Sequence, residues 1–121
     1  MIKRFECTNI YTKDTVGLIK FYSEQLGIPI QFEGFGNFDG AKIGFSRSEP
    51  GIVIWDENKW GKLSTGNVNF VFSCDSLDST YEQLKSKGVE LEPPAVAVWG
   101  GKEINFKDPE GNNITLLEQQ Y

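Results

Sequence analysis

Residues 99–112 read WGGKEINFKDPEGN and combine a β-strand with the turn that ends it. Polar and apolar residues alternate over 102–107, which predicts a strand with one buried face. Pro109 sets φ immediately after Asp108, and Gly111 or Asn112 can adopt the positive φ that closes such a turn. A further strand-like run follows at 113–119. The segment therefore predicts a β-hairpin near the end of the chain.

This hairpin completes a longer pattern that begins at residue 67. Residues 67–74 alternate between an apolar face and a face that is polar except at Val71, which is typical of a half-buried strand. Asp75 or Ser76 can cap a helix that Gly88 ends. A strand-like run at 89–98 contains Pro93 and Pro94, which predicts an edge or bulged strand. The second half thus predicts one strand, one helix and three strands.

The first half of the chain repeats the same order. Residues 4–12 alternate as a strand, Asp14 or Thr15 can cap a helix, and Gly27 stops that helix. Strand-like runs follow at 28–35, 41–47 and 51–56. We therefore expect an α+β fold of two βαβββ modules, about residues 1–57 and 66–121, with a linker at about 58–65. Each module alone has too small a core, so we expect both to form one domain.

Composition limits the classes of partner. The 121 residues carry a net charge of −5, with basic residues scattered, which argues against nucleic acid and anionic membranes as partners. No apolar run is long enough to span a bilayer, and the N-terminus lacks the apolar stretch of a signal peptide. The two cysteines do not make a disulfide framework. We expect a cytoplasmic protein with free thiols.

The chain resembles the vicinal oxygen chelate superfamily, which includes glyoxalase I, extradiol dioxygenases and the fosfomycin- and bleomycin-resistance proteins. The resemblance rests on four segments that cover most of the chain: 14–27 with Phe21-Tyr22, 72–78, Gly88-Val89 and 99–112. It implies that the paired modules form a curved, cup-shaped mixed sheet, assembled as a homodimer. In enzymes of this family, His, Gln and Glu side chains hold a divalent metal in the cup.

The metal-ligand positions implied by the resemblance carry unsuitable residues here. They fall on Cys7, Ile54, Asn69 and Thr115, with Asp56 as the acid nearest the second position. The chain contains no histidine. Of these side chains only Cys7 could be a strong ligand, and it would need its thiolate. Amide, hydroxyl and hydrocarbon groups are poor ligands for transition metals, so we expect no metal, no other cofactor and none of the usual catalysis of the family.

Metal-free members of the family suggest a different role. They resemble the bleomycin-binding proteins, which hold a ligand in an aromatic-lined groove without chemistry. We therefore expect a small organic ligand, such as a cationic antibiotic, which the acidic net charge would attract. The candidate ligand-binding residues are Cys7, Asn9, Ile54, Trp55, Asp56, Trp60, Asn67, Asn69, Trp99 and Thr115.

Each of these residues also has a purely structural interpretation. The asparagines can satisfy one another and nearby backbone groups, Cys7 can be a small buried apolar residue, and Trp99 can pack across the groove or at a dimer interface. Two other functions stay open. One is a divergent lyase or dioxygenase-type enzyme with an atypical site. The other is a protein-interaction module whose cup is filled by side chains such as Phe5 and Tyr11.

Overall fold

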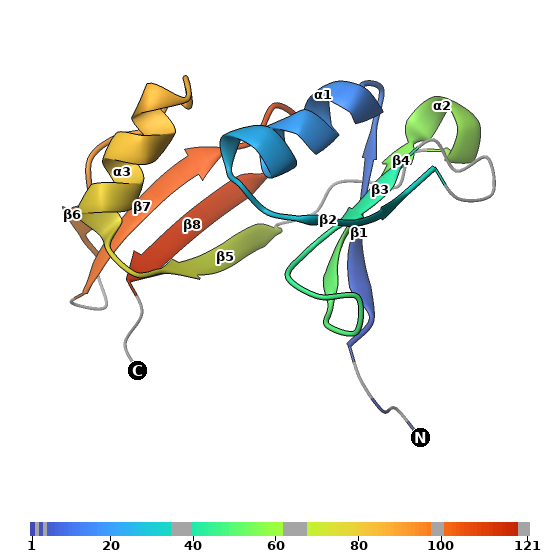
Figure 1. The fold of residues 1–121 in the computed structure, drawn as a ribbon, viewed down its shortest axis with the longest axis horizontal. Helices are drawn as coiled ribbons and strands as arrows, with labels where there is room; N and C mark the ends of the chain where they lie inside the picture. Colours follow the sequence, from blue (N-terminus) through green and yellow to red (C-terminus); the bar gives the residue numbers. More distant parts are fainter. Residues whose placement is uncertain (2, 4, 35–39, 62–67, 98–100, 119–121) are drawn as a thin grey trace. The chain divides into compact units, whose positions relative to one another are not determined.

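The chain folds into two compact units, residues 1–64 and 65–121, each with its own four-stranded sheet (Figure 1). This computed structural model describes residues 1–118 apart from 2, 4, 35–39, 62–67 and 98–100. Among the helices of the described residues, none has the length and apolar character needed to cross a membrane.

The first unit contains a sheet in the order β1-β4-β3-β2, with β1 parallel to β4 and the other pairs antiparallel. Its elements are β1 (Cys7–Thr12), α1 (Thr15–Lys20), the π-helical turn η1 (Phe21–Gln25), β2 (Ile30–Glu33), β3 (Ala41–Ile43), β4 (Gly51–Asp56) and α2 (Glu57–Trp60). The Asp14 carboxylate accepts a hydrogen bond from the backbone N–H of Gly17 and so caps α1.

Apolar side chains from the helical segment and the sheet form the core of the first unit. Helix α1 packs on β4, and the buried apolar residues of the unit are Ile10, Leu18, Phe21, Tyr22, Ile28, Ala41, Ile43, Ile52, Val53 and Ile54. Because strand residues alternate between faces, every second residue of β1 points into this core. The side chains between them lie on the opposite face of the sheet.

The second unit repeats the same topology, with the order β5-β8-β7-β6. Its elements are β5 (Asn69–Cys74), α3 (Leu77–Ser86), β6 (Ala95–Val96), β7 (Lys102–Lys107) and β8 (Asn113–Glu118). Strand β5 is parallel to β8, and α3 packs on β7 and β8. Two side chains cap α3: the Ser76 hydroxyl accepts from the backbone N–H of Ser79, and the Glu118 carboxylate accepts from that of Leu77.

The predicted α+β fold with two βαβββ modules is confirmed. Strands β4 and β7 have the predicted bounds, and the short β6 lies at the sheet edge after Pro93 and Pro94, as expected. Strands β2, β3 and β6 are shorter than the runs predicted at 28–35, 41–47 and 89–98. The type of one further segment also differs from the prediction. Residues 57–60, expected as the start of a polar linker, form the helical turn α2, because the Asp56 carboxylate caps it by accepting from the N–H of Asn58.

One carboxylate accepts three hydrogen bonds in the turn between β7 and β8, beside two backbone hydrogen bonds of the turn itself. Asp108 is 5% exposed, and its Oδ1 accepts hydrogen bonds from the backbone N–H groups of Glu110 at 2.9 Å and Asn112 at 2.8 Å. Its Oδ2 accepts from the Asn112 side-chain amide at 2.8 Å. Gly111 takes the positive φ, 85°, that the sequence assigned to it or to Asn112. This turn sets the register of the hairpin and therefore decides which side chains face one another across it.

Candidate functional site

Three aromatic side chains gather on one face of the first unit, which we call the aromatic face. Tyr11 on β1 stacks against Trp55 on β4 with 6.4 Å between ring centroids and 16° between planes. Trp60 on α2 meets Trp55 edge to face at 5.7 Å and is 50% exposed. The Trp55 indole N–H donates to Asn9 Oδ1 at 2.9 Å, which fixes the orientation of the ring. Such a rigid, partly exposed aromatic surface suits a planar or cationic ligand.

Ile54 lies on the opposite side of the same strand. It is 0% exposed, and its neighbours in register are the buried Ile10 and Ala41. Because adjacent strand residues point to opposite faces, Ile54 is directed into the core while Trp55 belongs to the aromatic face. The structure thus separates these two predicted site residues, a distinction that the run Gly51–Asp56 alone left open.

The remaining predicted residues of the first unit have local partners. Cys7 Sγ lies 3.5 Å from Asn9 Oδ1, so both side chains belong to the aromatic face. The Asp56 carboxylate caps α2, as described above. Lys42, which sequence reasoning did not single out, is 5% exposed, and its ammonium donates to the backbone oxygen of Arg47 at 3.1 Å. That contact ties β3 to the loop that precedes β4.

A hydrogen-bonded cluster of polar side chains lies on one face of the second unit, which we call the polar face. The Thr115 hydroxyl oxygen on β8 lies 3.2 Å from Asn69 Oδ1 on β5 and 2.5 Å from Asn105 Oδ1 on β7. The Asn105 side-chain amide donates to the Glu103 carboxylate at 3.0 Å. Asn69 and Thr115, both predicted as site residues, are therefore brought together by the fold.

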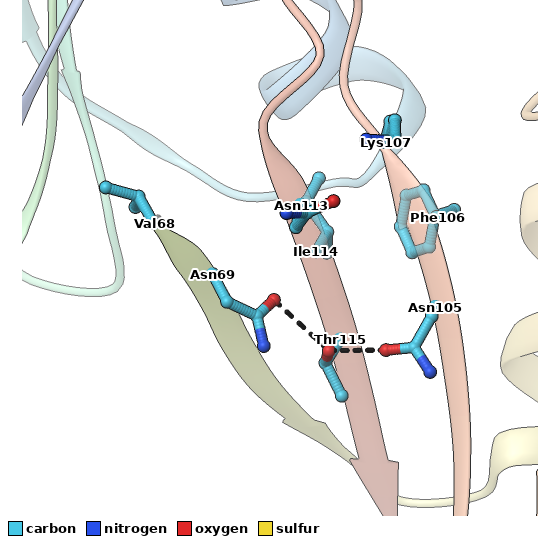
Figure 2. A pocket seen from close by; sticks show the side chains of 8 residues that line it. All are labelled: Val68, Asn69, Asn105, Phe106, Lys107, Asn113, Ile114 and Thr115. Carbon is cyan, nitrogen blue, oxygen red and sulfur yellow. Dashed lines mark hydrogen bonds between the residues drawn. The ribbon is translucent and has the colours of Figure 1, made fainter. Parts of the chain in front are cut away.

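A pocket of about 430 Å³ opens over this polar face (Figure 2). Its polar lining includes Asn69, Asn105, Lys107, Asn113 and Thr115. The volume falls within the range of small-molecule sites, roughly 300–1,000 Å³. The lining residues among those that the structure describes belong to the second unit. The other two predicted site residues, Asn67 and Trp99, lie outside the described residues.

The candidate ligand-binding residues named from the sequence did not include Tyr11, Glu103, Asn105, Lys107 and Asn113. The sequence contains a pattern that could have identified the last four of these residues. Alternation over 102–107 places Glu103, Asn105 and Lys107 on one face of β7. The Asp108 turn then pairs Asn105 with Thr115 and Lys107 with Asn113, as the hairpin register shows. Counting outward from the turn would have placed these side chains beside Thr115.

The side chains at the implied metal-ligand positions do not suit a transition-metal ion. The sequence has no histidine, and within the described part of the chain no three His, Cys, Asp or Glu side chains come together. Of the four positions implied by the resemblance, Ile54 is buried in the core, and Asn69 and Thr115 hydrogen-bond to each other. Neutral amides and a hydroxyl bind such ions weakly compared with imidazole, thiolate and carboxylate.

Comparison with known proteins decides the family. A model of the Glyoxalase/Bleomycin resistance protein/Dioxygenase superfamily matches residues 4–116. The chain belongs to this superfamily. One relative, the uncharacterized protein YetH of Bacillus subtilis (strain 168), is 27% identical over 121 residues, which cover 98% of this chain and all of YetH.

Solved structures of the superfamily share the fold. TnmS3, an antibiotic binding protein from Streptomyces sp. CB03234, matches with a TM-score of 0.77 and 21% identity, covering 98% of both chains. Lactoylglutathione lyase from Agrobacterium tumefaciens matches with a TM-score of 0.73 and 16% identity, covering 97% of this chain and 94% of the lyase. The glyoxalase fold therefore accommodates both a binding protein and an enzyme, and the function of this member must be argued from its own side chains.

Proposed function

We propose that this glyoxalase-superfamily protein binds a small cationic organic molecule, such as an antibiotic, without converting it. The observation that carries the proposal is the aromatic face. Trp55 is held in place by Tyr11 and by its hydrogen bond to Asn9, so ordering this ring on binding costs little conformational entropy. A fixed indole beside the half-exposed Trp60 is suited to stacking and cation–π contacts.

The charge of the protein supports a cationic ligand. The chain has a net charge of −5 at pH 7, which raises the local concentration of cations near its surface. The donor set described above also favours binding over metal-dependent chemistry, because its groups suit hydrogen bonding better than coordination of a transition metal. A small-molecule binding protein of the same fold, TnmS3, provides a structural precedent.

Titration with metal-free bleomycin, a cationic glycopeptide, tests the proposal. We expect saturable quenching of tryptophan fluorescence, because Trp55 and Trp60 form the proposed surface. Replacement Trp55→Leu should weaken binding by roughly tenfold or more, since it removes one aromatic stacking surface. Phe45→Leu serves as the matched control, because Phe45 is an exposed aromatic residue (63%) in the loop after β3. Absence of saturable quenching across a panel of cationic antibiotics would contradict the proposal.

Metal analysis distinguishes binding from the enzymatic alternative. Protein purified without a histidine tag should contain less than stoichiometric Zn, Ni, Mn or Fe, and treatment with a chelator should leave ligand affinity unchanged. The reason is that the proposed contacts are made by aromatic rings and amides. One tightly held transition-metal ion per chain would instead favour a divergent lyase or dioxygenase-type enzyme with an atypical site.

A further inference from the structure

The polar face of the second unit carries a continuous chain of hydrogen bonds. It runs from the Glu103 carboxylate through the Asn105 amide to the Thr115 hydroxyl and on to the Asn69 amide. Figure 2 shows its last three members side by side, drawn from three neighbouring strands. Residue Glu103 precedes Asn105 by two positions on β7, so both side chains lie on the same face.

The Glu103 carboxylate determines which group is the donor in each hydrogen bond of this series. Glu103 offers acceptor oxygens only, so Asn105 must turn its NH₂ group toward Glu103 and its Oδ1 toward Thr115. The hydroxyl has one proton, and the shorter contact, 2.5 Å, assigns it to Asn105 Oδ1. Thr115 then has no proton left for Asn69.

Asn69 can instead donate a hydrogen bond to the Thr115 hydroxyl oxygen. Rotating its terminal amide by half a turn places the NH₂ group against the Thr115 oxygen, which still has a lone pair to accept a hydrogen bond. The Asn69 carbonyl oxygen then takes the position at which Figure 2 draws the amide nitrogen. Since Asn69 lines the pocket, this oxygen is an acceptor available to a bound molecule.

Donor groups lie farther along the same pocket. Asn113 is the register partner of Asn69 on β5 and of Lys107 on β7, so it stands between them. The Asn113 amide and the Lys107 ammonium both offer N–H donors. The charges of Glu103 and Lys107 are opposite, so together they add no net charge to this face. The pocket therefore places the Asn69 acceptor beside the donors of Asn113 and Lys107, an arrangement that suits a neutral group.

We propose that this pocket binds a carboxamide, whose N–H donates to Asn69 and whose carbonyl oxygen accepts from Asn113 or Lys107, and that Glu103 is the positioning residue that sets this polarity. The inference rests on the proposed ligand-binding function and names the chemical group that the second unit recognises.

Four probes of one shape test the inference: benzamide, methyl benzoate, benzoate and benzamidine. Binding is followed from the chemical shifts of the ¹⁵N-labelled side-chain amides of Asn69, Asn105 and Asn113. We expect benzamide to bind roughly tenfold more tightly than methyl benzoate, which lacks the N–H donor. Benzoate and benzamidine should be weaker than benzamide, because each keeps only one half of the donor–acceptor pair.

Replacement Glu103→Gln tests the positioning role. A glutamine can donate as well as accept, so Asn105 can turn over and the Thr115 proton can pass to Asn69. We expect the benzamide preference over methyl benzoate to fall below about threefold, together with changed Asn105 amide resonances and unchanged cooperative unfolding. Ser73→Ala is the matched control, because Ser73 lies on the same face of β5 but outside the chain of hydrogen bonds.

The competing outcomes each overturn the inference. Tightest binding of benzamidine would make the pocket a cation site, and tightest binding of benzoate would make it an anion site centred on Lys107. Equal binding of all four probes, or no shift of the three amides, would exclude carboxamide recognition. An unchanged preference in the Glu103→Gln protein would remove the positioning role. None of these results affects the fluorescence titration at the aromatic face, so the two proposals fail separately.

Discussion

Replacement Ile54→Ala is expected to lower the free energy of unfolding by about 3 kcal/mol. The side chain is 0% exposed at the centre of β4, between the register partners Ile10 and Ala41. Removing its methyl and methylene groups forfeits their burial and leaves a cavity in a strand that cannot move closer to its neighbours. Urea unfolding followed by circular dichroism measures the change.

Two variants control this prediction. Ile54→Val removes one methylene group and should cost about 1 kcal/mol, while Ile30→Ala should cost less than that, because Ile30 is 39% exposed on β2. The folded Ile54→Ala protein should keep its affinity for bleomycin, since Ile54 faces away from Trp55. A clear loss of bleomycin affinity in the folded Ile54→Ala protein would show instead that Ile54 contributes to the ligand site.

Replacement Asp108→Ala is expected to lower the free energy of unfolding by a comparable amount, about 3 kcal/mol. The buried carboxylate accepts three hydrogen bonds, from two backbone N–H groups and from the Asn112 amide. Alanine leaves these donors without their partner in a turn where Asp108 itself is 5% exposed. The same urea titration measures the loss.

Glu110→Ala is the matched control for the turn. Glu110 has an exposed side chain, and its backbone N–H keeps its contact with Asp108 in the variant. It should therefore change the free energy of unfolding by less than about 0.5 kcal/mol. Equal effects of the two substitutions would show that Asp108 does not hold the hairpin together.

Several features of this protein followed from local sequence alone. The alternation over 102–107 located strand β7, since a strand with one buried face needs a period of two. The short apolar run within 51–56, preceded by Pro50, located strand β4. The cap at Asp14 and the turn at Asp108 depend on contacts within four residues, so nearby residue types suffice to predict them. The repeated βαβββ order and the family resemblance rest on these local signals, and both are confirmed.

Other features depended on contacts between distant residues. Trp55 meets Asn9 across 46 positions of sequence, and Thr115 meets Asn69 across the same separation. Those pairs exist because β1 lies parallel to β4 and β5 to β8, an arrangement that the spacing of residues along a single strand does not encode. Strand pairing in the tertiary structure therefore decided which side chains share a surface. It placed Ile54 in the core, Trp55 on the aromatic face, and Asn69 beside Thr115.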